Sequence, residues 1–201
     1  VKKVQAGWPG GFYCEDAKCR GRLQPDPPSG YACPKCGRKY TGEQWDRLLA
    51  YVGHEEAAAA AAALGFAWQW TGQERYARKA AEILLAYAAA IPGFSLGHNW
   101  LGDCWLMENF LLGYDYIYEW LPRESRAKID GDLLMTMVRR IYHYNHHYPE
   151  GQIRIQRVCG WAALLAKDPV WVPYILFSLT GNRGVSLRYG LTDDMVSLKG
   201  P

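Results

Sequence analysis

Four cysteines near the start of the chain are the residues best suited to chemistry. The second pair lies in Cys33-Pro-Lys-Cys36-Gly37. A tight turn there aims two sulfur atoms at one point, and the glycine lets backbone N–H groups approach them. A further thiolate pair, Cys14 and Cys19, completes the tetrahedron that zinc takes in structural sites. We therefore predict a structural zinc ion with Cys14, Cys19, Cys33 and Cys36 as its ligands.

The segment between the two pairs, residues 20–30, has almost nothing apolar to pack and needs a cross-link of some kind. Two alternatives to zinc stay open: two disulfides, if the chain is exported, and a knuckle that has lost its metal. The other two cysteines, Cys104 and Cys159, stand alone in apolar helical surroundings and are predicted to be buried thiols. This usage fits metal binding better than a secreted disulfide framework.

A second polar group stands at the end of a predicted helix, next to a Pro/Gly break where side chains can face a cleft. Its members are His143, Asn145, His146, His147, Tyr148 and Gln152. Such residues can also simply cap the helix and extend into solvent. His143 and His147, four residues apart, can alternatively form a metal-binding pair. The isolated His54 and His98 are predicted to cap or pack rather than to catalyse.

Composition narrows the class of protein. With 201 residues and 22.8 kDa, the chain can bury one good core beside a small Cys-rich lobe. The 9 Trp and 14 Tyr are many for this length, and such rings suit stacking against flat ligands such as sugars. A net charge of only +3, from scattered basic residues, argues against a dedicated nucleic-acid binder. There is no apolar run of about 18 residues, so no membrane span is predicted.

The rest of the chain predicts helices joined by short turns, at about residues 43–52, 54–70, 73–90, 100–120, 122–148, 151–167 and 170–179. Thr41 is the expected N-cap of the first helix, with Gln44 at the capping-box position. Gly53 is expected to interrupt this helical region. Because short connections make neighbours antiparallel, we predict an all-α fold of helical hairpins.

Helical hairpins close into an α/α toroid or open into a solenoid, and the lack of a repeat of about 34 residues counts against a tandem array. We expect a Cys-rich zinc-knuckle segment at residues 1–42 and a partial toroid at residues 43–201. The chain begins with Val1, carries no signal peptide, and ends abruptly at Pro201. We expect it to be a piece of a longer protein.

Several segments, taken in order, resemble the N-terminal part of the heparinase II/III-type polysaccharide lyases. They are residues 12–14, the turn 33–42, His54 opening an alanine-rich helix, and residues 71–87, 108–117 and 182–195. The resemblance runs over most of the chain, is sharpest over residues 12–92, and is diffuse from 123 to 180.

This resemblance implies an N-terminal α/α toroid joined to a C-terminal β-sandwich, with the active cleft between them. The present chain would be an incomplete toroid without the sandwich. It also implies a protein that resides in the periplasm or outside the cell and acts on an acidic polysaccharide. The family's catalytic tyrosine follows a Gly-Pro-like segment, and Gly200-Pro201 ends this chain, so we expect the chain alone to be inactive.

Members of the family cleave uronate-containing polysaccharides by β-elimination. The enzyme neutralises the uronate carboxylate, removes the neighbouring proton and protonates the departing oxygen, and Tyr or His serves as base and acid. The resemblance implies that Asn145 and His146 neutralise the carboxylate and that Gln152, His147 and Tyr148 bind substrate. The chain departs from the family pattern at residues 153–163, where a further Asn or His is expected and Cys159-Gly160 stands.

Two other functions fit parts of the sequence. An α/α-toroid glycoside hydrolase needs two carboxylates flanking the scissile bond, and one long predicted helix carries Asp103, Glu108, Asp115 and Glu119. A non-catalytic helical scaffold with a zinc knuckle, binding a partner protein, is the third possibility.

Overall fold

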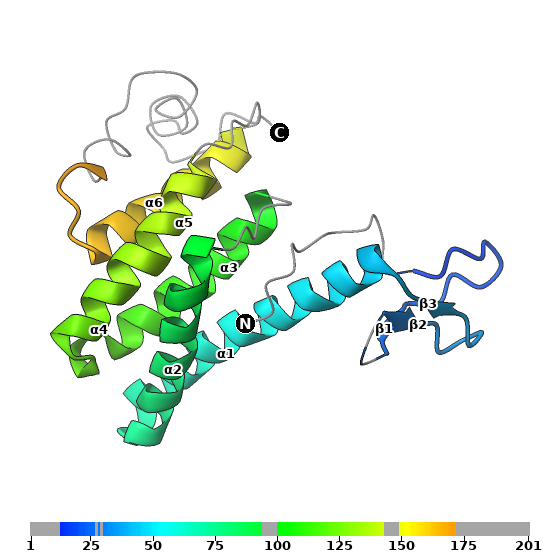
Figure 1. The fold of residues 1–201 in the computed structure, drawn as a ribbon, viewed down its shortest axis with the longest axis horizontal. Coiled ribbons are helices and arrows are strands. Elements are labelled where there is room, and N and C mark those ends of the chain that lie inside the picture. The colour runs from blue at the N-terminus through cyan, green and yellow to red at the C-terminus, as the bar shows by residue number, and fades with distance from the viewer. Residues whose placement is uncertain (1–12, 27, 29, 94–99, 143–148, 172–201) are drawn as a thin grey trace, which may run out of the picture.

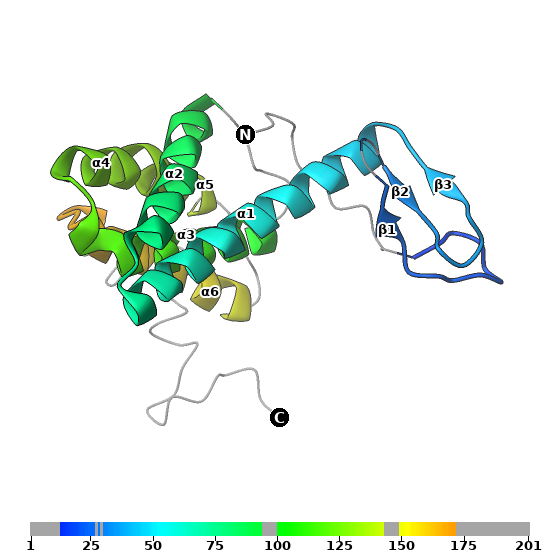
Figure 2. The ribbon, with the colours of Figure 1, turned by 90° about the horizontal axis from the view of Figure 1, so that it is seen from below.

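The computed structural model describes residues 13–26, 28, 30–93, 100–142 and 149–171. Over these residues the chain is mostly helical, with one small three-stranded sheet near its N-terminus (Figure 1). The sheet lies at the N-terminal end of a long helix, α1 (Glu43–Thr71), and the other helices gather around the remainder of α1 (Figures 1 and 2). The predicted helical body and small Cys-rich lobe are both present.

The sheet consists of three two-residue strands: β1 (Gln24–Pro25), β2 (Tyr31–Ala32) and β3 (Lys39–Tyr40). They are antiparallel in the order β1-β2-β3, and Tyr31 of β2 lies opposite Pro25 on one side and Tyr40 on the other. Strands this short do not hold together by backbone pairing alone. Their support is an apolar cluster that includes the buried side chains Cys14, Leu23, Tyr31, Cys33, Tyr40, Trp45 and Leu48.

Helix α1 runs without interruption through Gly53, so the predicted break there is wrong. A mid-helix glycine costs about 1 kcal/mol relative to alanine, and continuous burial of one helix face offsets that cost. The expected capping box is also wrong. The N-cap is Gly42, at φ +106°, and its carbonyl accepts hydrogen bonds from the N–H groups of Trp45 and Asp46.

The alanine-rich part of α1 packs against α3 (Trp100–Ile117) with the two backbones almost in contact. A Cβ atom added to Gly113 of α3 would lie 2.9 Å from the backbone of Ala61, and one added to Gly65 of α1 would lie 2.9 Å from Tyr116 Cβ. The small side chains of this part of α1 therefore let α3 approach closely.

Helix α2 (Glu74–Ala90) folds back on α1 after a turn at Gly72, which adopts the left-handed conformation at φ +65°. Its bounds agree with the predicted helix at 73–90. A short 3₁₀ turn, η1 (Ile91–Gly93), follows it at Pro92, where the ring rules out a further helical hydrogen bond.

The predicted helix at 122–148 is less regular than expected. A 3₁₀ turn, η2 (Tyr118–Trp120), precedes α4 (Arg123–Lys128), a π-helical segment, η3 (Ile129–Met135), and α5 (Thr136–Ile141). The hydroxyl of Thr136 donates to the Gly131 carbonyl at 3.1 Å within the widened turn. Helix α6 (Pro149–Leu165) matches the helix predicted at 151–167, and most of the one predicted at 170–179 lies outside the described residues.

Two polar contacts tie the later helices to the earlier ones. Arg157 of α6 pairs with Glu108 of α3 at 2.7 Å, and Arg140 of α5 donates to the Ile91 carbonyl at 2.8 Å. The second contact brings the end of α5 against η1, beside the end of α2. None of the helices in the described part of the chain combines the length and the apolarity that crossing a bilayer requires.

Candidate metal centre and neighbouring pockets

The four predicted ligand cysteines converge in the lobe. Their Sγ atoms all lie within 4.8 Å of one another, and none of the chain's six cysteines is in a disulfide. Cys14 Sγ lies 3.7 Å from Cys36 Sγ, and Cys19 Sγ lies 3.6 Å from Cys33 Sγ. A bonded sulfur pair would be about 2.05 Å apart, whereas a tetrahedral zinc site with Zn–S near 2.3 Å places its sulfurs about 3.8 Å apart. These four cysteines can therefore hold one metal ion.

Two tight backbone loops present the sulfurs. In the first, the Cys14 N–H donates to the Gly21 carbonyl at 2.8 Å, which closes the loop that carries Cys19. In the second, the Cys33 N–H donates to the Arg38 carbonyl at 2.9 Å and the Gly37 N–H donates to the Cys33 carbonyl at 2.8 Å. Gly37 adopts φ +73°, the conformation that glycine supplies most readily.

Gly21 leaves room for the sulfurs. A Cβ atom at this position would lie 2.7 Å from Cys33 Sγ and 3.6 Å from Cys19 Sγ. Only a residue without a side chain lets the backbone come this close to the cluster. Nothing in the local sequence marks Gly21 as part of the site, because its position two residues after Cys19 does not reveal its contact with the second loop.

Two other side chains attach to the centre. The hydroxyl of Tyr40 donates to Cys14 Sγ at 3.0 Å and accepts a hydrogen bond from the Glu15 N–H at 2.9 Å. The Lys35 ammonium donates to the Cys19 carbonyl at 2.9 Å and so joins the two loops. The Tyr40 hydroxyl thus places a hydrogen-bond donor at one of the four sulfurs, which favours the anionic form of that sulfur.

The lobe shifts the pKa values of three of the thiols in different directions. The hydrogen bond from Tyr40 lowers the pKa of Cys14. Burial acts to raise the pKa of Cys33, but the N–H groups of Cys36 and Lys35 together with two neighbouring thiols outweigh it and lower that pKa to about 7. The Gly21 N–H favours the Cys19 thiolate, but burial and the three neighbouring thiols outweigh it and raise its pKa to about 12. A bound cation removes this conflict, because it favours the deprotonated form of every ligand.

The two remaining cysteines are buried in the helical body, as predicted. Cys104 and Cys159 are both fully buried, and burial raises the pKa of Cys104 to about 12. A thiol in this state is a weak nucleophile. These residues therefore belong to the apolar core.

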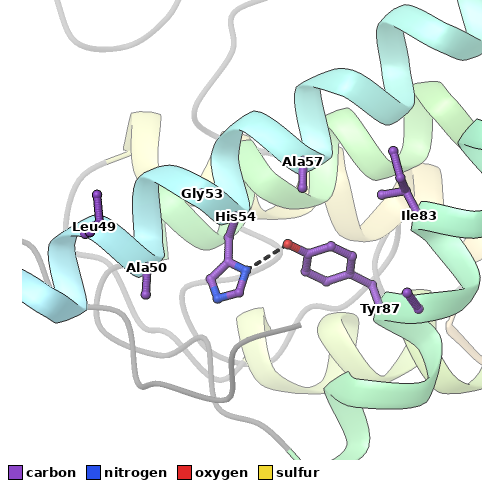
Figure 3. A pocket seen from close by; sticks show the side chains of 8 residues that line it. Leu49, Ala50, Gly53, His54, Ala57, Ile83 and Tyr87 are labelled. Carbon is purple, nitrogen blue, oxygen red and sulfur yellow. Dashed lines mark hydrogen bonds between the residues drawn. The ribbon is translucent and has the colours of Figure 1, made fainter. Parts of the chain in front are cut away.

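A separate pocket of about 420 Å³ opens between α1 and α2 (Figure 3). Its walls are mostly apolar, and Nδ1 of His54 lies 2.7 Å from the Tyr87 hydroxyl. Both side chains are buried. Burial raises the pKa of Tyr87 to about 12, so the phenol keeps its proton and can donate it to Nδ1. The predicted packing role of His54 is confirmed, but its partner lies 33 positions away, and no local spacing indicated it.

A second hollow, of about 470 Å³, lies where the end of α1 meets the end of α3. Two of the four acids on the predicted long helix line it, Asp115 and Glu119. The rest of its lining is Trp68, Gln69, Gly72, Tyr116 and Trp120. The other two acids lie elsewhere: Asp103 is buried, and Glu108 pairs with Arg157. Two of the four acids, Asp115 and Glu119, therefore line the same hollow.

The residues predicted to neutralise the uronate carboxylate, Asn145 and His146, lie outside the described residues, as do His147 and Tyr148. Gln152 falls within α6, but its side chain is not described. Their arrangement stays a prediction.

No protein-family model matches the chain, and no curated protein matches it.

Proposed function

We propose that the lobe binds one structural zinc ion through Cys14, Cys19, Cys33 and Cys36. The observation that carries this proposal is the convergence of the four Sγ atoms to within 4.8 Å. Four thiolates in tetrahedral array suit zinc, and they also suit iron. The closed ligand set leaves no open coordination position for substrate, so the ion's role is to fold the lobe.

We further propose that the protein is a lyase that cleaves a uronate-containing polysaccharide by β-elimination. The support is the ordered resemblance to heparinase II/III-type lyases, together with the antiparallel packing of α1 and α2, which suits the first part of an α/α toroid. In this proposal Asn145 and His146 offset the charge that builds on the uronate carboxylate, while Gln152, His147 and Tyr148 bind the sugar.

The zinc proposal is tested by metal analysis of protein purified without chelators. We expect one zinc per chain, and no zinc in the Cys33→Ser variant. Cobalt substitution then reports the ligand set, since thiolate-to-cobalt charge-transfer bands of tetrahedral four-sulfur sites are distinctive. Iron in place of zinc would correct the metal, and protein without any bound metal would refute the proposal.

The lyase proposal is tested with the product of the complete reading frame. Heparan sulfate, alginate and hyaluronate are incubated with it, and the ultraviolet absorbance of unsaturated product is followed. Asn145→Ala should lower the rate about 100-fold or more, as for the loss of one preorganised donor. Asn109→Ala on α3 is the matched control and should leave the rate unchanged. Absence of unsaturated product from all three polymers, or an equal loss in both variants, would contradict the proposal.

A second candidate function, glycoside hydrolysis, is favoured by the hollow between α1 and α3. It combines two carboxylates with three aromatic side chains, and aromatic rings bind the apolar faces of sugars. Asp115 and Glu119 would act as the acid and base. New reducing ends without unsaturated product, lost in Asp115→Asn and in Glu119→Gln, would establish this function in place of the lyase.

A further inference from the structure

The contacts of Tyr40 connect the sulfur cluster to the start of helix α1. Its hydroxyl makes two hydrogen bonds: it donates to Cys14 Sγ at 3.0 Å and accepts from the Glu15 N–H at 2.9 Å. Its ring packs against Trp45, in the first turn of α1, with ring centroids 5.0 Å apart. Tyr40 is only 6% exposed and Trp45 only 5%, so neither side chain has room to turn away.

The Trp45 ring also packs against Tyr31 of the middle strand, with ring centroids 5.8 Å apart. Leu48, one turn further along α1, is fully buried in the same cluster. The first two turns of α1 are therefore packed into the lobe, and the Tyr40 hydroxyl links the same cluster of rings to Cys14.

We propose that Tyr40 is a positioning residue of the metal centre and couples metal binding to the order of the first turns of α1. The inference rests on the proposed zinc site. Four thiolates around a divalent ion carry excess negative charge, and the O–H of Tyr40 offsets part of it at Cys14. Outer donors of this kind orient a ligand and set its donor strength.

The first test uses the zinc-loaded full chain with Tyr40→Phe, which keeps the ring and removes only the hydroxyl. Tyr31→Phe is the matched control, because it removes a hydroxyl from a ring packed on the same tryptophan. We expect Tyr40→Phe to bind one zinc per chain and release it to excess chelator about tenfold faster than the unmodified chain, at the lower end of outer-ligand effects. Tyr31→Phe should release zinc at the unmodified rate.

Two readouts follow the coupling itself. In the cobalt-loaded proteins, the charge-transfer bands of Tyr40→Phe should move to longer wavelength, because Cys14 loses a hydrogen bond and donates more strongly. In hydrogen exchange followed by mass spectrometry, removal of the metal should expose the amides of residues 43–50 and leave those of residues 57–70 protected. Zinc-loaded Tyr40→Phe should show a smaller loss of protection confined to residues 43–50.

The outcomes separate the inference from the proposal beneath it. An unmodified chain that binds no metal would overturn both. A zinc-binding chain in which Tyr40→Phe matches the unmodified protein in release rate and cobalt spectrum would overturn the inference alone, as would equal acceleration by Tyr31→Phe. If Tyr40→Phe is purified with normal helix content but without metal while Tyr31→Phe retains it, the inference is supported.

Discussion

The lobe and the helical body are stabilised in different ways. In the lobe, two-residue strands and polar loops surround four sulfurs, and the apolar cluster is small. In the body, α1, α2 and α3 bury alanine, leucine and aromatic side chains, and the backbones of α1 and α3 nearly touch at Gly113. A cross-link can therefore replace an apolar core where the chain is too short and polar to form one.

The largest expected effect comes from removing the metal cross-link, which should unfold the lobe and leave the helical body folded. Cys33→Ser should abolish metal binding, which contributes on the order of 10 kcal/mol to the folding of small structural zinc sites. Hydrogen exchange should then show no protection over residues 13–40, while circular dichroism retains most of the helix signal. Cys104→Ser is the reciprocal variant. It should keep the metal and destabilise the body by about 1–3 kcal/mol, because a hydroxyl replaces a buried thiol. Loss of all helix signal in Cys33→Ser would contradict the separation.

The next effect concerns the close contact within the body. Gly113→Ala places a methyl group 2.9 Å from the backbone of Ala61, so α1 and α3 must move apart. Overpacking of this kind costs about 1–3 kcal/mol, to be measured by urea unfolding. Gly131→Ala is the control, since a Cβ there meets no atom within 4 Å. It should leave stability unchanged or raise it by up to about 1 kcal/mol. Unchanged stability in Gly113→Ala would show that the contact is not tight.

A smaller effect is expected at the pocket between α1 and α2. Tyr87→Phe removes the hydroxyl 2.7 Å from His54 Nδ1 and should cost about 1–2 kcal/mol of unfolding free energy, because a buried polar group loses a partner. Tyr76→Phe, on the same helix but only partly buried, should cost less. Metal content should be unchanged in both variants. Equal costs for the two would argue that the pair with His54 contributes nothing.

The smallest effect is a pH dependence at Asp130. Burial raises the pKa of this carboxyl above its usual 3.8, against the lowering effects of the Tyr114 hydroxyl at 2.7 Å and of Arg126. The folded state therefore holds the proton more tightly than the unfolded state. The free energy of unfolding should fall as pH rises from about 3.8 through the raised value.

After solvent screening the change should be less than about 1 kcal/mol. Urea unfolding across the acidic pH range should show that Asp130→Asn removes this slope. Asp132→Asn, on the exposed side of the same segment, should retain it. A slope unchanged in Asp130→Asn would assign the effect to other groups.

The sequence predicted features that depend on local chemistry. The convergence of Cys14, Cys19, Cys33 and Cys36 followed from ligand type and spacing. The bounds of α2 followed from its periodicity and flanking turns. Helix α3 begins where predicted but ends at Ile117, three residues before the predicted end. Gly53 failed as a helix break because tertiary burial along α1 outweighs one residue's propensity. The π-helical turn at η3 has no comparable local signal.

Contacts between residues far apart in the sequence were not predicted, because no local pattern indicates them. Tyr87 approaches His54 only because α2 folds back on α1, and Gly21 meets Cys33 only because the two loops of the lobe interlock. The roles predicted for residues 145–152 come from the resemblance, and the side chains of these residues lie outside the part of the chain that the structure describes.

The uninterrupted α1 makes the two regions mechanically continuous. With 29 residues it is a rod about 43 Å long, and Trp45 near its start is seated in the lobe. Because α1 is continuous, a small tilt of the lobe would move the whole helix and would not be absorbed at a hinge. A force or partner acting on the sulfur-bearing tip would be felt where the rod crosses α3.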